Sequence, residues 1–426
     1  MKVFSLLFML TAATGAALLQ GCVKDHCTHS ALYKVYTPHY LSMAEVRATT
    51  GPEAPRALEK TGKLFYHNGY LFIGEANQGI HIIDDRDPAA PRNIGFLNIP
   101  GNLDMTVSGN ILYADNYVDM VSFDITDPSN SRPIGREENV FPIHTYGYAF
   151  SDDPSGKGMI TGFTVSDSTI DRDCSVSKNT DVIYTGTAVA YSSATQSSSS
   201  APKAVSQGGS TSRFAVQGHY LYAVQQDSMS LYNIADPAHP AYLNNIPLGF
   251  SVETIYPYQQ YLFIGAPQGV LIYDASDPGQ PVFLSQFSHV FACDPVVAQG
   301  HYAYATLRSG SLCMVNGSLN QLLVIDISNL KYPQLLRQVS MTNPGGLAVN
   351  GNDLIVTDGA GGIRFLNLKD PEHPEIVHTL EAPKAASDVM MVGQVAIVVA
   401  DDGVYQYNYE NMESPRLLSK MGISPK

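Results

Sequence analysis

Short apolar runs and turn residues alternate along most of the chain. In the first full unit, the runs cover residues 64–67, 70–76, 80–84 and 92–99, and Gly, Asn and Pro residues separate them. Each run has the length of a strand and is rich in β-branched and aromatic residues, and the 3.6-residue periodicity of an amphipathic helix is absent. The pattern therefore predicts four short antiparallel strands in this unit.

The unit recurs along the chain. The segment YLFIGEANQGIHIIDDRDP (70–88) resembles six later segments, which end at residues 128, 237, 278, 330, 371 and 412. Their ends are 40 or 41 residues apart, except for spacings of 109 residues before 237 and 52 before 330. Four short strands in each period of this length are typical of a β-propeller blade. A β-solenoid has a shorter period, and a pair of sandwiches would not repeat so regularly.

We therefore predict an all-β fold, a β-propeller of four-stranded blades, over residues 62–426. Seven copies predict seven blades, and six or eight are the alternatives. The longest spacing holds one or two periods, so an eighth blade would lie there. An insertion at 142–212 ends in a serine-rich tract and is either an extended hairpin or a degenerate eighth blade. The segment PRALEKTG (55–62) resembles PRLLSKMG (415–422), which makes it a candidate for closing the ring.

The third strand of each unit carries a family resemblance. LLVIDIS (322–328) and its relatives GIHIIDD and MVSFDITDP resemble the LVIVD repeat of bacterial extracytoplasmic propellers. Residues 62–142 resemble the start of LVIVD-repeat lipoproteins of the Bacteroidota type. The resemblance covers nearly all of the chain after residue 22 and is weakest at 142–212. It implies a propeller and an envelope or surface location, and it implies no particular activity.

The charge composition limits the kinds of molecule that the protein is expected to bind. The 426 residues include 25 Lys and Arg against 39 Asp and Glu, a net charge of −14. This balance argues against binding to nucleic acid or to an anionic membrane surface. The 35 Gly and 26 Pro residues suit many short strands, and the composition excludes coiled-coil, collagen-like and disordered proteins.

The first 22 residues, MKVFSLLFMLTAATGAALLQGC, have the features of an export signal: one lysine, an apolar run and small residues. The ending LQGC resembles a lipobox, so residues 1–21 are expected to be a lipoprotein signal peptide and Cys22 the lipid attachment site. The alternative is an ordinary signal peptide in which Cys22 is incidental. We expect the protein to be exported and held by lipid at the outer membrane, on its periplasmic face or at the cell surface. Residues 22–61 then form a spacer with one short helix, since Ser42-Met43-Ala44-Glu45 reads as a capping box.

Four cysteines follow the lipid site, and an even number in an oxidising compartment favours disulfides. Cys293 and Cys313 fall within one unit, which favours that pair and leaves Cys27 with Cys174. Four cysteines allow three connectivities, so the other pairings stay open, and inert free thiols are the remaining alternative.

Motifs for chemistry are missing from the sequence. It has no GxSxG elbow, HExxH, Walker loop or GxGxxG after a strand, so we predict no catalytic residue, no metal site and no cofactor. Asp84, Asp85 and Asp87 resemble calcium ligands, but they align with turns, where Asp bonds its own backbone.

One set of carboxylates occupies the same position in several of the aligned units. It opens the first strand of four units and consists of Asp104, Glu253, Asp294 and Asp388. First strands line the channel of a propeller, so these groups are a candidate ligand site at one channel mouth. Lys63 and Arg213 match them in two other units. The interpretation we favour is structural: each carboxylate caps a turn or pairs with a neighbouring blade.

Three functions fit the sequence. The first is a non-catalytic binding or scaffold protein that engages an extracellular or periplasmic protein or glycan through the insertions at 142–212 and 308–320. The second is a propeller enzyme acting on extracellular glycan with channel-mouth carboxylates. The third is a structural surface-coat protein. The missing catalytic motifs favour the first, and fold alone does not decide among them.

Overall fold

The computed structural model describes residues 28–141, 158–173, 206–208, 212–225, 227–249, 252, 254–266, 269–288, 295–308, 320–383 and 385–424. These residues form two compact units, one of residues 28–39 with 162–173 and one of the other described residues. All five cysteines lie outside the described residues, as do Glu253 and Asp294. The predicted lipid site and disulfides therefore stay predictions.

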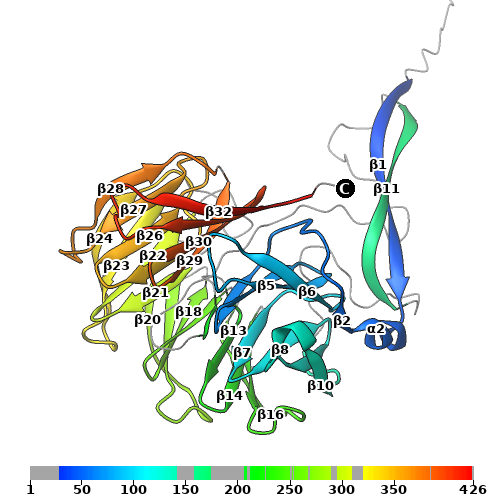
Figure 1. Cartoon of the computed structure of the whole chain (residues 1–426), viewed down its shortest axis with the longest axis horizontal. Coiled ribbons are helices and arrows are strands. Elements are labelled where there is room, and N and C mark those ends of the chain that lie inside the picture. The colour runs from blue at the N-terminus through cyan, green and yellow to red at the C-terminus, as the bar shows by residue number, and fades with distance from the viewer. Residues whose placement is uncertain are drawn as a thin grey trace, which may run out of the picture. The chain divides into compact units, whose positions relative to one another are not determined.

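The larger unit is built of antiparallel sheets (Figure 1). The described residues contain six sheets of four strands and one of six, in which a four-stranded blade has an added strand at each edge. The strands of each blade follow one another in chain order, and the first strands of consecutive sheets contact each other. This is the arrangement of a β-propeller. The prediction of an all-β propeller with four-stranded blades is confirmed, and we number the sheets blades 1 to 7 along the chain.

The strands of blades 1 to 3 have the following bounds. Blade 1 contains β3 (Leu64–His67), β4 (Tyr70–Glu75), β5 (Gly79–Asp84) and β6 (Arg92–Asn98). Blade 2 contains β7 (Met105–Ser108), β8 (Ile111–Asn116), β9 (Asp119–Asp124), the 3-10 turn η1 (Pro128–Asn130) and β10 (Arg132–Glu137). Blade 3 contains β13 (Phe214–Gln217), β14 (Tyr220–Val224), β15 (Ser228–Asn233) and β16 (Ala241–Pro247).

Blades 4 to 7 repeat the same order. Blade 4 contains β17 (Thr254–Tyr258), β18 (Tyr261–Ala266), β19 (Gly269–Asp274) and β20 (Val282–Ser288). Blade 5 contains β21 (Val296–Gln299), β22 (Tyr302–Leu307), β23 (Gln321–Asp326) and β24 (Gln334–Ser340). Blade 6 contains β25 (Leu347–Asn350), β26 (Asp353–Thr357), β27 (Ile363–Asn367) and β28 (Glu375–Leu380). Blade 7 contains β29 (Ala386–Val392), β30 (Val395–Ala400), β31 (Gly403–Asn408) and β32 (Arg416–Gly422).

The core lies between the blades. Phe72 and Ile82 of blade 1 pack in one buried cluster with Leu112 and Phe123 of blade 2. Neighbouring blades thus cover both faces of the middle strands, which is why the second and third runs of each unit are nearly continuous apolar segments. In blades 2 to 7 the fourth strands are the open edges, and no residue of β16 is buried.

The ring closes between blades 7 and 1. Leu71 and Ile83 of blade 1 share a buried cluster with Ile397 of blade 7. Leu58 joins this cluster, and its carbonyl accepts a hydrogen bond from Ser424 N (2.8 Å). The segment 55–62 is not a strand, so it contributes to closure by packing across the seam rather than by adding a strand to a sheet.

Blade 1 carries a further strand at each edge. β2 (Gly51–Glu53) pairs with β6 at the outer edge, and β12 (Ser206–Gly208) pairs with β3 at the inner edge. Before β2, Ser42 begins the short helix α2 (Met43–Thr49) with a capping box, in which Ser42 Oγ accepts from Glu45 N (3.2 Å). Within the described ranges, no helix is long and apolar enough to cross a membrane.

The smaller unit is a two-stranded ribbon. It comes from β1 (Thr28–Leu41) and β11 (Met159–Asp173), of which residues 40–41 and 159–161 belong to the larger unit. Lys34 pairs with Asp167 (Nζ to Oδ1, 2.5 Å), and the rings of Tyr36 and Phe163 meet edge to face. The described part of the insertion 142–212 thus supplies β11 and β12, and whether the rest forms a blade stays open.

Candidate functional site

The loop after each third strand has an Asp or Asn at two fixed positions. In blade 2, Asp124 Oδ1 accepts from Thr126 N (2.9 Å) and Asp127 Oδ1 accepts from Ser129 N (3.1 Å). The same two hydrogen bonds form in the other six blades, with these acceptors: Asp84, Asp87, Asn233, Asp236, Asp274, Asp277, Asp326, Asn329, Asn367, Asp370, Asn408 and Asn411. These are Asx turns, so the acidic residues fix the backbone of the loop.

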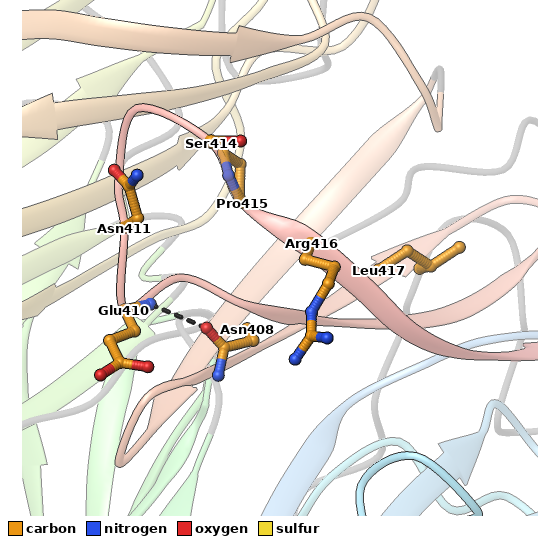
Figure 2. A pocket seen from close by; sticks show the side chains of 7 residues that line it. All are labelled: Asn408, Glu410, Asn411, Ser414, Pro415, Arg416 and Leu417. Carbon is orange, nitrogen blue, oxygen red and sulfur yellow. Dashed lines mark hydrogen bonds between the residues drawn. The ribbon is translucent and has the colours of Figure 1, made fainter.

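Figure 2 shows this loop in blade 7, where it borders an open hollow of about 610 Å³. Glu410 N donates to Asn408 Oδ1 (3.1 Å), as Figure 2 shows. Glu413 N donates to Asn411 Oδ1 (3.0 Å). The hollow is therefore lined by the turn that every blade contains. Nothing in this turn is specific to blade 7, and we do not regard it as the functional site.

Asp104, the first of the predicted channel-mouth carboxylates, lies directly before β7 and is buried. Its Oδ1 accepts from Met105 N (2.7 Å), and its Oδ2 accepts from Arg213 N (2.5 Å). Lys63 Nζ lies 4.0 Å from the same Oδ2. Since Lys63 precedes the first strand of blade 1 and Arg213 that of blade 3, this carboxylate links three consecutive blades.

A second buried carboxylate, which we did not single out in the sequence, lies beside Asp104. Asp115 Oδ1 accepts from Asn102 Nδ2 (2.8 Å), Leu103 N (2.8 Å) and Asp104 N (2.9 Å). Burial raises the pKa of Asp115 to about 7, although these donors act to lower it. Burial also raises the pKa of Asp104, against the nearby charge of Lys63. A lone acidic residue within an apolar second strand is the signal that would have identified Asp115.

Asp388 lies in β29 and is also buried, and its Oδ1 accepts from Val389 N (2.8 Å) on the same strand. The structure therefore places two of the four predicted carboxylates, Asp104 and Asp388, in hydrogen bonds to backbone. Glu253 and Asp294 lie outside the described residues, so the channel-mouth ligand site stays a prediction for them.

Blade 1 contains another buried group of polar side chains. Glu75 ends β4, His81 lies in β5, and both are fully buried, with His81 Nε2 at 2.8 Å from Glu75 Oε2. Asn93 Nδ2 donates to Arg56 O (2.7 Å) and lies 3.3 Å from His81 Nδ1. Nε2 of His81 is thus the ring nitrogen that faces Glu75, and Nδ1 is the one that faces Asn93.

Arg56 completes this group. Its Nη2 donates to Glu75 Oε2 (3.2 Å) and Gln78 Oε1 (2.8 Å), and its guanidinium carbon lies 3.6 Å from the centroid of the Phe96 ring. Burial acts to raise the pKa of Glu75, but the hydrogen bond from His81 and the charge of Arg56 lower it overall. The sequence signal was a Glu and a His within runs that are otherwise apolar.

A cavity of about 290 Å³ lies next to this group, at the seam between blades 7 and 1. Arg56, Leu58, His81 and Ile83 line it, and Met421 of β32 lines it from blade 7. The cavity thus combines apolar walls with a small number of polar groups, which is typical of small-molecule sites.

A third group fixes α2 to blade 2. Arg47 of α2 donates to Asp119 from Nε (2.8 Å) and Nη2 (3.1 Å), and Arg136 Nη1 also donates to Asp119 (2.7 Å). Asp119 is fully buried, which acts to raise its pKa, but the two guanidinium groups and Asn139 N lower it overall. This carboxylate is a docking point for the N-terminal segment.

Comparisons with known proteins agree with this architecture. A family model described as the LVIVD repeat matches residues 208–246 and 292–340. The expected resemblance to LVIVD-repeat propellers is thereby confirmed for the repeat. A comparison with curated proteins finds no significant match.

Solved structures resemble the chain at low sequence identity. The periplasmic gluconolactonase PpgL of Pseudomonas aeruginosa aligns with a TM-score of 0.54 at 11% identity, over 92% of this chain and 97% of that one. A functionally unknown protein from Desulfotomaculum acetoxidans aligns with a TM-score of 0.51 at 10% identity, over 86% and 98%. At such identities the likeness concerns the fold alone. The chain is a β-propeller that carries LVIVD repeats.

Proposed function

We propose that the protein is a binding or scaffold propeller of the bacterial cell envelope, held there by lipid on Cys22, and that its partner is a protein. The export signal and the LQGC ending support the location. The described contacts of Asp104, Asp115 and Asp119 support a non-catalytic role, because each of these carboxylates accepts hydrogen bonds from the protein itself.

The observation that carries the proposal is a row of exposed apolar side chains on the fourth strands. The second residue of this strand is 40–53% exposed in five consecutive blades, and we call these residues the outer-strand belt: Tyr242, Phe283, Leu335, Ile376 and Leu417. In blades 1 and 2, Asn93 and Pro133 occupy the same position. The five residues recur at one strand position along the outer edge of five consecutive blades, and this exposed apolar surface is the candidate protein-binding surface.

Binding to the envelope tests this proposal. The exported domain without its lipid is mixed with outer-membrane vesicles, and we expect the variant Phe283→Ser/Leu335→Ser to bind at least about tenfold more weakly than the unchanged domain. Val165→Ser removes an equally exposed apolar residue outside the belt, so this control should bind normally. Protease treatment of the vesicles should abolish binding and periodate treatment should not. Unchanged binding by the double variant, or loss on periodate treatment alone, would contradict the proposal.

The anchor is tested separately. Replacing Cys22 by Ser removes the thiol that accepts the lipid, so the variant should leave the detergent-soluble membrane fraction or stay unprocessed. Cys27→Ser is the control, because it removes a nearby thiol and leaves the LQGC motif intact. A Cys22→Ser protein that has lost residues 1–21 and still fractionates with the membranes would show that lipid on Cys22 is not the anchor.

A further inference from the structure

We propose that the outer edge of blade 5 binds the protein partner by strand addition: an extended, acidic segment of the partner, with apolar side chains, pairs with β24 as a fifth strand. This inference rests on the proposed function, because it names the binding mode and the partner's chemistry at one part of the outer-strand belt. Three features support it: an added strand within this chain, the open backbone of β24, and the side chains of that edge.

Blade 1 shows that an outer edge of this propeller accepts an added strand. β2 pairs antiparallel with β6, with Gly51 opposite Asn98 and Glu53 opposite Phe96. It comes from the segment before the blade and is not part of the four-stranded repeat. The twist and the β-bulge of a fourth strand are therefore compatible with a further strand at this edge.

The backbone of β24 is open at the equivalent place. Met341 N donates to Asn320 O (2.8 Å), on the side of β23. Because hydrogen bonding alternates along an antiparallel pair, Gln338 and Ser340 direct their N–H and C=O groups away from β23. The equivalent residues of β6 are the first and third of the three that pair with β2. Within the described ranges, β24 pairs with β23 alone, so these groups are available to a partner strand.

Proline blocks the outer edge in two other blades. Pro247 of blade 3 occupies the position of Ser340, and Pro133 of blade 2 occupies that of Leu335. Proline has no N–H to donate to an added strand, and it is a common protection of sheet edges. β24 contains no proline, so blade 5 keeps the backbone donors that strand addition requires.

The exposed side chains of this edge call for apolar groups on the partner. Every residue of β24 except Val339 is exposed, so a partner reaches both faces of the strand. Leu335 is 43% and Leu336 38% exposed, and Tyr332, just before the strand, is 71% exposed. An extended segment with apolar side chains buries this surface while its backbone pairs with the strand.

The charge of the edge calls for acidic groups on the partner. The chain has a net charge of −14, yet Lys331 and Arg337 at this edge are exposed and have no acidic partner among the described residues. In blade 7, by contrast, Lys420 of the fourth strand pairs with Asp402 (2.7 Å). Carboxylates on the added segment complement the two cations of blade 5.

A proline variant tests the backbone contact. Ser340→Pro removes an outward N–H and keeps every apolar side chain of the edge, and Pro247 shows that this position accepts proline. In the vesicle assay described above, this variant should bind at least about tenfold more weakly than the unchanged domain. Ser288→Pro, at the equivalent position of blade 4, is the matched control and should bind normally. Both variants should keep the thermal unfolding of the parent.

Hydrogen exchange of the unchanged domain provides a measurement that needs no variant. On binding to the vesicles, the amides of Gln338 and Ser340 should exchange more slowly, because they then donate to the added strand, whereas residues 282–288 should not change. The charge is tested by Arg337→Glu, which should bind at least about threefold more weakly. Lys369→Glu, which reverses an exposed lysine in blade 6, should bind normally.

The outcomes separate this inference from the proposed function. If the double variant of the belt binds weakly but Ser340→Pro binds normally, or if exchange at Gln338 and Ser340 is unchanged, the belt acts without strand addition and this inference is overturned alone. Equal losses in Ser340→Pro and Ser288→Pro, or normal binding by Arg337→Glu, would also overturn it. If the unchanged domain does not bind the vesicles, both the inference and the proposed function are wrong.

Discussion

Two buried aspartates of this propeller have pKa values that are shifted in opposite directions. Asp119 meets two guanidinium groups, which hold its pKa below the usual range despite burial. Asp115 meets an amide and two backbone N–H groups, and burial raises its pKa to about 7. Neutral donors thus satisfy the hydrogen bonds of Asp115, but they do not compensate for the solvation free energy that its ionised form loses on burial.

The replacement Asp115→Asn should therefore change the pH dependence of stability. The folded pKa is about 7 and the unfolded value is near 4, so the folded state binds the extra proton. The resulting stabilisation is fully present below pH 4 and is lost as the pH rises through 7, a change on the order of 4 kcal/mol. The difference in free energy of unfolding between parent and variant should fall over this range, measured by urea unfolding at successive pH values.

Asp124→Asn is the control for that measurement. Hydrogen bonds to Thr126 and the charge of Arg132 lower the pKa of Asp124 to about 2, and Asn serves the same turn in blades 3, 6 and 7. Its effect on the pH dependence should appear only below about pH 4. A difference between the parent and Asp115→Asn that is flat from pH 4 to 8 would refute the assignment for Asp115.

At the scale of elements, the repeat follows from a few local rules. Apolar runs form the strands, and the Asx turns after each third strand set the direction of the fourth. A β-bulge also interrupts the pairing of third and fourth strands in each described blade, for example between Ile82 and Ile83. The bulge has no side-chain signature of its own, which is why the sequence did not predict it.

The Asx turns can be tested in blade 7. Asn411→Ala removes the side-chain acceptor for Glu413 N and should lower the free energy of unfolding by about 1 kcal/mol. Asn411→Asp keeps the acceptor, and Asp occupies this position in five other blades, so this variant should stay close to the parent. Urea unfolding provides the comparison, and equal losses in both variants would show that the turn does not depend on the side-chain acceptor.

Local rules predicted strands well and long-range partners poorly. The runs at 64–67 and 80–84 agree with β3 and β5, because alternation and turn residues are local signals. The pairing of β1 with β11, and of Arg47 with Asp119, joins residues far apart in the chain, and no local pattern records it. For the same reason the sequence indicated polar residues such as Glu75 without indicating the cavity beside them.

At the scale of the whole molecule, the closing interface differs from the others. Gln406 Nε2 of blade 7 donates to Asp85 Oδ1 of blade 1 (2.5 Å), and both groups are buried. The residue equivalent to Asp85 is apolar in the other blades: Ile125, Ile234, Ala275, Ile327, Leu368 and Tyr409. Only the seam between the last and the first blade, among the described interfaces, carries this polar pair.

A double-mutant cycle tests the pair. Gln406→Leu leaves Asp85 buried without this donor and should lower the free energy of unfolding by about 1–3 kcal/mol. The double variant Asp85→Leu/Gln406→Leu reproduces the apolar contact of the other interfaces and should recover most of the loss. Ile82→Leu/Ile125→Leu, two apolar exchanges at the equivalent pair of positions in blades 1 and 2, controls for changes in packing. Losses that simply add in the double variant would show that the two residues do not interact.

The Asp85–Gln406 pair also determines which two blades meet when the ring closes. Blades whose contacts are alike can exchange between copies of the chain. Asp85, in contrast, needs a partner blade that supplies a buried hydrogen-bond donor. Blade 7 of the same chain is the nearest blade with such a donor. A circularly permuted gene with its new ends between blades 3 and 4 keeps this contact within the chain and should give a monomer. The unpermuted chain, whose first and last blades meet at the seam, should favour the exchange of blades between copies when it carries Gln406→Leu.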